Sequence, residues 1–142
     1  MLRSLILIIT LGLFSQSGLS QKVTGPLSRF WLAGQFRISA NQQIDFLRKF
    51  YNNKLPGISR RSIDIVKDII VIEQTDDYKL SGKTGGGILS DTDYIMWLVG
   101  YLEKNAQVYY YAMNFKTNDY DKTSQARYEI TKSILKELRL ID

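Results

Sequence analysis

Apolar and polar positions divide this chain into a helical part followed by a strand-rich part. From Ser39 to Leu55 apolar side chains recur at helical spacing, and Ser39–Gln42 has the S-x-x-Q form of a capping box. Pro56-Gly57 ends this helix. Ser59 is placed to cap a second helix. The buried stripe predicted for that second helix consists of Ile63, Val66, Ile69 and Ile70.

After the second helix the period of the pattern changes, and three strands are predicted. They are Tyr78–Lys83, Ile95–Glu103 and Val108–Phe115, in the order of an antiparallel meander. The last two are apolar on both faces, as expected for central strands that helices cover on each side. A closing helix follows, with Thr123 or Ser124 as its cap. Two helices, a meander and a closing helix predict the α+β class.

The first twenty residues differ in character from the rest. Arg3 forms a positive beginning, Leu5–Phe14 an apolar run, and Gly18 and Ser20 are small residues suited to a cleavage site. We interpret residues 1–20 as a secretory signal, with an uncleaved membrane anchor as the alternative. This interpretation predicts a secreted or periplasmic domain at residues 21–142, without a stable membrane span after cleavage.

The composition excludes several kinds of chemistry. The 142 residues, 44% of them hydrophobic, fit one domain and contain neither cysteine nor histidine. Thiol nucleophiles, Cys/His zinc sites, disulfides and Ser-His-Asp triads are therefore excluded, and no metal or cofactor is predicted. Removing residues 1–20 takes away Arg3 and no acid, which leaves 18 basic and 14 acidic side chains, a net charge of +4. These scattered charges do not predict nucleic-acid binding and mildly favour small anionic ligands.

One short motif can bind an anion. Lys83-Thr84-Gly85 places an ammonium and a hydroxyl at the end of the first predicted strand, where Gly85 lets another backbone approach closely. The alternative is a solvated lysine before a flexible glycine turn.

Four blocks of sequence carry a resemblance. In order they are FWLAGQFRISANQQIDFLRKFYNNKLP, YKLSGKTGGG, MWLVGYLEKNAQVYYYAMNF and SQARYEI. At these separations they resemble the C-terminal half of the class D serine beta-lactamases, and also the beta-lactam sensor domains of bacterial receptors. The resemblance runs from about Val23 to the C-terminus. It implies the C-terminal part of the serine beta-lactamase and DD-peptidase-like fold.

The resemblance also implies a set of binding residues. Lys83 would line the pocket and help with proton transfer, while Thr84 and Arg127 would bind the carboxylate of a beta-lactam. The N–H of Gly86 matches half of the family's oxyanion hole, and Trp31 matches a tryptophan that packs over the catalytic lysine. Without such roles, Trp31 is ordinary core, Arg127 a helix-surface charge and Gly86 a loop hinge. The full predicted set is Lys83, Thr84, Gly85, Gly86, Arg127 and Trp31.

The motifs that carry out the family's chemistry are not found. The family places a nucleophilic serine and its lysine base in S-x-x-K, followed by S-x-V and Y-G-N, all before the FWL block. Here the one S-x-x-K is Ser133–Lys136, after the K-T-G motif, and we interpret it as a solvated surface pair. Neither S-x-V nor Y-G-N occurs. The resemblance therefore implies a truncated class D-like domain of beta-lactam hydrolase descent that is inactive as this chain.

Three alternatives accompany this reading. The chain could bind a beta-lactam or peptidoglycan-like small molecule without catalysis, as a sensor module does. It could be one half of a hydrolase completed by a second polypeptide, or a gene remnant without function. In any truncated domain, apolar side chains of the sheet would be partly uncovered and would favour self-association. The residues expected to be uncovered are Trp97, Val99, Tyr109 and Tyr111.

Overall fold

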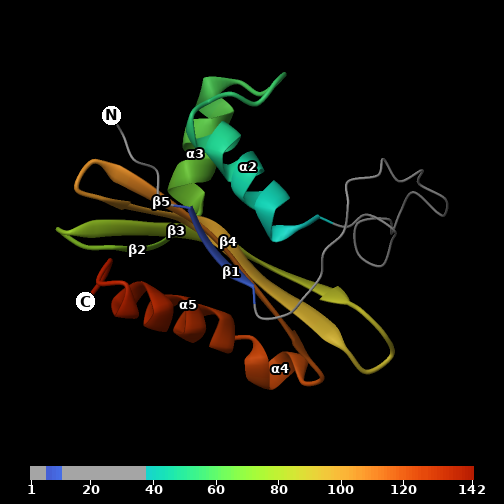
Figure 1. Cartoon of the computed structure of the whole chain (residues 1–142). Helices are drawn as coiled ribbons and strands as arrows, with labels where there is room; N and C mark the ends of the chain where they lie inside the picture. Colours follow the sequence, from blue (N-terminus) through green and yellow to red (C-terminus); the bar gives the residue numbers. More distant parts are fainter. Residues whose placement is uncertain (1–5, 11–37) are drawn as a thin grey trace.

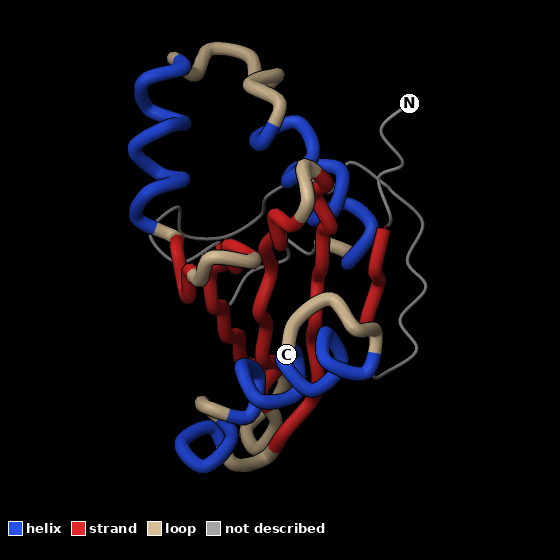
Figure 2. The backbone as a smooth tube through the Cα atoms, turned by 90° about the vertical axis from the view of Figure 1, so that its left-hand side faces the viewer, coloured by secondary structure: helices blue, strands red, loops and turns tan. Residues whose placement is uncertain are grey.

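A five-stranded sheet lies between helices in the part of the chain that the computed structural model describes, residues 6–10 and 38–142 (Figure 1). The strands are β1 (Ile6–Thr10), β2 (Val71–Gln74), β3 (Tyr78–Ile88), β4 (Tyr94–Lys104) and β5 (Gln107–Thr117). The helices are α2 (Ala40–Tyr51), α3 (Arg60–Ile69), α4 (Tyr120–Thr123) and α5 (Ala126–Glu137). Helices α2 and α3 lie on one side of the sheet and α4 and α5 on the other, and Figure 2 shows the strands side by side from a second direction. The predicted α+β class is confirmed.

The predicted meander forms the centre of the sheet, whose strand order is β1-β5-β4-β3-β2. Strands β3 and β4 pair without a break from Tyr78↔Lys104 to Ile88↔Tyr94. Strand β2 runs antiparallel to the beginning of β3, and β1 runs parallel to β5. Neither outer strand was predicted from the sequence. Strand β1 lies within the predicted secretory signal, which stays a prediction.

Strand β3 extends five residues beyond its predicted end at Lys83, through the glycine-rich segment to Ile88. Glycine has a low strand propensity, so the sequence of this segment does not predict a strand. The unbroken pairing with β4 overrides that local preference.

Both predicted caps of the first two helices are confirmed. The Gln42 N–H donates to Ser39 Oγ at 3.2 Å, and the Ser39 N–H donates to Gln42 Oε1 at 2.8 Å, which completes the capping box. Ser59 Oγ accepts from the Ser62 N–H at 3.1 Å and caps α3.

No helix in the described part of the chain combines the length and apolar character needed to cross a membrane.

The predicted buried stripe of α3 is wrong for two of its four members, Val66 and Ile69. Ile63 is buried among the side chains under α2, but Val66 is exposed and Ile69 is 74% exposed. Ile70 is half-buried and is the C-cap. Helix α3 therefore contacts the core through Ile63 and, at its C-cap, through Ile70, while Val66 and Ile69 are exposed.

The predicted cap of the closing helix is also wrong. Asp119 caps a short helix, α4, in which Thr123 is the last residue and Ser124 the C-cap. Helix α5 then starts after Gln125, which makes no side-chain capping bond. A separate helical turn before α5 takes up the residues that the sequence assigned to its start.

Two hydrophobic clusters fill the two faces of the sheet, because successive strand side chains point to opposite sides. The cluster on the α2 side contains Ala40, Ile44, Leu47, Phe50, Ile63, Tyr101, Tyr110 and Ala112. The cluster on the α5 side contains Leu80, Leu98, Leu102, Tyr111, Met113, Leu135 and Ile141.

Four apolar residues of the sheet were expected to be partly uncovered. Trp97, Val99 and Tyr109 are half-buried, but Tyr111 is only 1% exposed, so the expectation was wrong for Tyr111. Self-association stays a prediction.

Tyr111 is buried because two glycines leave room for it. It lies in register with Gly100 on β4 and Gly82 on β3, and its hydroxyl donates to the Ser81 carbonyl oxygen at 2.9 Å. A Cβ on Gly100 would lie 2.6 Å from Gly82 Cα and 2.6 Å from the Tyr111 hydroxyl. This row of one tyrosine and two glycines joins the three central strands across the α5 face.

We predict that Gly100→Ala lowers the free energy of unfolding by about 3 kcal/mol or more, because backbone atoms that no rotamer change can move surround the new methyl group. Urea denaturation followed by circular dichroism measures the loss. Gly87→Ala is the matched control, since its Cβ would meet Ile95 Cγ2 at an acceptable 3.4 Å. Equal destabilisation by the two substitutions would contradict the close-approach argument.

Candidate functional site

The outer edge of β3 is open along its glycine-rich half. Strand β2 pairs with β3 only as far as Ser81, and the Gly82 N–H donates to the Ile70 carbonyl oxygen at 2.8 Å. Within the described residues, β4 is the one strand that pairs with β3 beyond that point. In an antiparallel strand, the N–H and C=O groups of every second residue point to the same edge. The Gly82 N–H points away from β4, and the β3–β4 register has no bulge. The N–H groups of Thr84 and Gly86 therefore point to the open edge as well.

Arg127 joins this strand to the C-terminal part of the chain. It lies in the first turn of α5 and is 8% exposed. Its Nη1 donates to the Gly85 carbonyl oxygen at 2.9 Å, and its Nε donates to the Ser124 carbonyl oxygen at 2.8 Å. These two bonds engage two of the five guanidinium N–H groups. The fold thus brings Arg127 to the K-T-G motif, as the resemblance implies, and the reading of Arg127 as a surface charge is wrong.

Lys83 and Thr84 meet at the same edge. Thr84 pairs with Leu98, whose side chain is buried on the α5 face, so Thr84 and Arg127 lie on one side of the sheet. Lys83 begins on the other face and is exposed, but its ammonium turns back to the strand. Its Nζ donates to the Thr84 carbonyl oxygen at 3.0 Å and lies 3.4 Å from Thr84 Oγ1. The Lys83 ammonium, the Thr84 hydroxyl and the Arg127 guanidinium therefore come from one short part of β3 and from the first turn of α5.

A residue that the sequence did not indicate also lies at this edge. The ring of Tyr120, in α4, occupies the space beside Gly86, where a Cβ would meet Tyr120 Cε2 at 2.9 Å. The ring also makes an edge-to-face contact with Tyr94, with centroids 5.6 Å apart. Tyr120 stands alone among polar residues in the sequence, so no spacing rule pointed to it.

Two carboxylates at this end of the molecule are paired with lysines. The Lys116 ammonium, 2.8 Å from Asp93, holds the pKa of that carboxyl below its usual range. The N–H of Lys122 and then its ammonium, 3.2 Å away, lower the pKa of Asp119 in the same way. Pairing offsets these negative charges, so they weaken the positive potential of Lys83 and Arg127 less than free carboxylates would.

Other predicted residues do not join the site. Trp31 lies outside the described residues. Ser133 and Lys136 are both exposed on α5, in agreement with their interpretation as a surface pair. Among residues 6–10 and 38–142, no acidic side chains gather in a group of three that could hold a metal ion.

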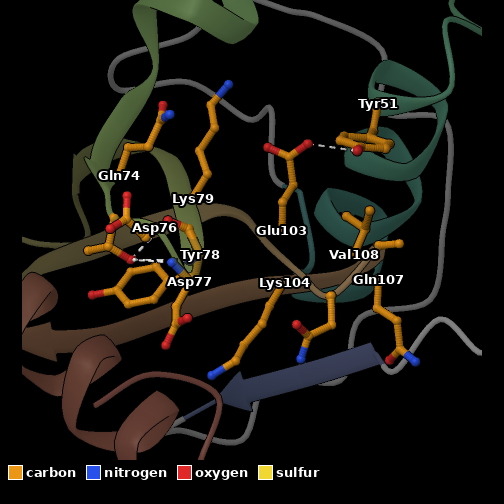
Figure 3. Close-up of a pocket in the computed structure, with 13 residues that line it drawn as sticks. Tyr51, Gln74, Asp76, Asp77, Tyr78, Lys79, Glu103, Lys104, Gln107 and Val108 are labelled. Atoms are coloured by element: carbon orange, nitrogen blue, oxygen red, sulfur yellow. Dashed lines mark hydrogen bonds between the residues drawn. The ribbon is translucent and has the colours of Figure 1, made fainter.

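A hollow of about 320 Å³ lies near the beginning of β3 (Figure 3). Figure 3 shows Lys79 and Glu103 pointing to one side of the hairpins, and Asp77 and Lys104 pointing to the other. The Tyr51 hydroxyl donates to Glu103 at 2.8 Å within it. Lys79 is four strand residues from Lys83, about 13 Å away. This hollow is open, carries charges of both signs and is separate from the K-T-G edge.

The chain is similar to known proteins in sequence and in fold. The family described as the penicillin binding protein transpeptidase domain matches residues 3–136. Beta-lactamase OXA-48 of Klebsiella pneumoniae is 39% identical over 122 residues, which cover 86% of this chain and 45% of that protein. The structure of the class D beta-lactamase YbXI from Nostoc has 42% identity and a TM-score of 0.73, over 80% of this chain and 46% of that one. The C-terminal domain of the BlaR penicillin receptor of Bacillus licheniformis has 31% identity and a TM-score of 0.71, over 80% and 45%.

The chain spans less than half the length of each of these relatives. The predicted resemblance to class D enzymes and to receptor sensor domains is confirmed in both sequence and fold.

Proposed function

Because the chain belongs to the penicillin-binding protein transpeptidase domain family, we propose that the open edge of β3 binds beta-lactams through their carboxylate. The observation that carries this proposal is the bond from Arg127 Nη1 to the Gly85 carbonyl oxygen. It holds a guanidinium against the strand that presents Lys83 and Thr84. We further propose that these 142 residues do not hydrolyse the ligand by themselves.

Each group at the edge has a part in binding. The remaining N–H groups of Arg127 and the Thr84 hydroxyl donate to the carboxylate, and charge-assisted bonds of this kind are the strong ones. The Lys83 ammonium adds a second positive charge beside Thr84. The N–H of Gly86, which points to the same edge, donates to the carbonyl oxygen of the lactam and supplies half of an oxyanion hole. A peptidoglycan-like peptide ending in a carboxylate offers the same groups.

Hydrolysis needs two groups that these residues do not supply. Acyl transfer requires an attacking hydroxyl and a base to take its proton, and the family provides both in an S-x-x-K motif before the K-T-G. Ser133 is exposed on the surface of α5 and follows the K-T-G in sequence. Without nucleophile and base, an oxyanion donor gives only residual catalysis. The predicted signal at residues 1–20 would place the binding site outside the cytoplasm.

We predict that Arg127→Ala weakens the binding of benzylpenicillin by about 10- to 100-fold, because hydrogen bonds to charged groups contribute about 1.5–3 kcal/mol. Isothermal titration calorimetry on the purified chain measures the affinity. Arg61→Ala removes the same charge from the exposed surface of α3 and should leave it unchanged.

Because Arg127 also bonds two carbonyl groups, Thr84→Val serves as a second probe of the same strand edge, and thermal melting confirms that each variant is folded. Unchanged affinity in the folded Arg127 and Thr84 variants would contradict carboxylate binding at this edge. Nitrocefin turnover above that of a boiled sample would contradict the lack of hydrolysis.

A second candidate function is one half of a hydrolase that another polypeptide completes. The observation that favours it is the outer surface of α3, where Ile65, Val66 and Ile69 are exposed. At this spacing the three side chains lie on one face of the helix, and exposed apolar side chains that gather on one face are typical of protein interfaces. More than half of the length of each relative lies outside the part that this chain matches, and that part is the proposed source of the nucleophile and base.

We predict that co-expression with the remaining half of a class D relative produces beta-lactam hydrolysis, measured by nitrocefin turnover in cell extracts. Ile69→Lys should reduce that activity at least several-fold, because it places a charge in the interface. Leu138→Lys makes the same change at an exposed position at the end of α5 and should have no effect. If no pairing gives activity, or if both substitutions act alike, this candidate function is wrong.

A further inference from the structure

We propose that the hollow near the beginning of β3 (Figure 3) is a second binding site, which takes a zwitterionic amino acid with an aliphatic side chain, such as leucine. The two charged partners of this ligand are Lys79 and Glu103. The site goes beyond the proposed function, because Lys79 lies about 13 Å along β3 from Lys83.

Four strands contribute one side chain each to a row that crosses this end of the sheet. Gln74 on β2 pairs with Lys79 on β3, which pairs with Glu103 on β4. Glu103 in turn pairs with Val108 on β5. Directly opposite residues point to the same face, with Cβ atoms about 5 Å apart. The row therefore presents, in order, an amide, an ammonium, a carboxylate and an apolar side chain.

The carboxylate of this row is held in place by Tyr51. The Tyr51 hydroxyl donates to Glu103 Oε1 at 2.8 Å, which puts the row on the face that α2 covers. Burial, and then the bond to Glu103, raise the pKa of Tyr51, so its hydroxyl remains a donor. The Tyr51 ring is itself fixed by Lys67 Nζ, 4.4 Å from its centroid, and by an edge-to-face contact with Tyr101 at 5.0 Å. Figure 3 shows the second Glu103 oxygen turned away from Tyr51, toward the side of Lys79.

The two opposite charges of the row are available to a ligand. The salt bridges formed within the described part of the chain do not include Lys79 or Glu103. Both side chains are half-buried, so their charges are less screened than those of fully exposed side chains. An α-amino acid carries an ammonium and a carboxylate on one carbon atom. Its ammonium can donate to the second Glu103 oxygen, while its carboxylate accepts from Lys79 and from the Gln74 amide.

The rest of the lining selects the kind of ligand. Three carboxylates and two ammonium groups line the hollow, those of Asp76, Asp77, Glu103, Lys79 and Lys104. This balance disfavours a ligand that is only an anion and suits a zwitterion. Val108 is half-buried and follows Glu103 in the row, so the side chain of a ligand whose ammonium meets Glu103 can pack on it. A volume of about 320 Å³ is sufficient for one amino acid.

The test is a titration of the ¹⁵N-labelled full chain with leucine, followed by NMR. We predict a dissociation constant of about 1 mM, with the largest shifts at the amides of Lys79 and Glu103. Leucine amide lacks the carboxylate, and 4-methylpentanoic acid lacks the ammonium. Each should bind at least about 5-fold more weakly than leucine. Glycine, which has no side chain to pack on Val108, should also bind more weakly.

Two variants test the charged partners. Lys79→Gln and Glu103→Gln should each weaken leucine binding about 5- to 10-fold. Lys104→Gln is the matched control, since Figure 3 shows Lys104 pointing to the other side of the hairpins, and it should leave the affinity unchanged. The amide spectrum shows whether each variant is folded, and the ligand series tests the site without any variant.

Three results would overturn the second site. They are the absence of shifts at about 10 mM leucine, equal affinity for leucine and its two analogues, and equal loss in the Lys79 and Lys104 variants. Each of them leaves the proposed function standing, because that function is tested with benzylpenicillin and Arg127→Ala. Conversely, failure of benzylpenicillin to bind leaves the leucine site standing.

Discussion

The guanidinium of Arg127 is the group on which the candidate site depends. It is almost fully buried, and a buried cation is stable only when its donors find partners. The carbonyl oxygens of Gly85 and Ser124 supply two, one from the K-T-G strand and one from the end of α4. The same contacts that satisfy the cation also fix the geometry of a strand edge and of the turn beside it. The bonds that make burial of Arg127 possible therefore also place its positive charge and its remaining N–H donors beside the open edge of β3.

The sheet makes that open edge available. Strand β2 ends its pairing at Ser81, and the second half of β3 consists mainly of glycine, threonine and lysine. Glycines weaken an isolated strand, but here β4 pairs with every residue, and the Tyr111 side chain crosses two glycines to reach the Ser81 carbonyl. The strand is therefore ordered by one neighbour and by packing from the α5 face. Its other side stays free for a ligand with donors and acceptors of its own.

Local rules predicted the parts of the fold that depend on local chemistry. The capping bonds of Ser39 and Ser59 and the central meander were found because serine spacing and apolar runs determine them directly. Strand β2 and the extension of β3 were missed because their pairing comes from partners elsewhere in the chain. The exposure of Ile69 was missed for the opposite reason, since helical spacing shows which residues share a face but not whether another element covers it.

In the candidate site, too, local chemistry could be predicted from the sequence, and contacts between distant segments could not. Lys83 and Thr84 were singled out by their side chains, but Arg127 was predicted only through a resemblance, because its bond to Gly85 spans 42 residues that no spacing rule connects. Tyr120 was missed because its importance comes from the absence of a side chain at Gly86. The missing side chain of Gly86 and the ring of Tyr120 come together only when the chain folds.

We propose that an anionic beta-lactam binds at the open edge of β3 beside Arg127. A titration of the ¹⁵N-labelled chain with benzylpenicillin, followed residue by residue by NMR, tests this most directly. Binding at this edge should give the largest shifts at the amides from Lys83 to Gly87 and at the Arg127 Nε–H. Shifts confined to the hollow around Tyr51 and Glu103, or no shifts at millimolar ligand, would contradict it.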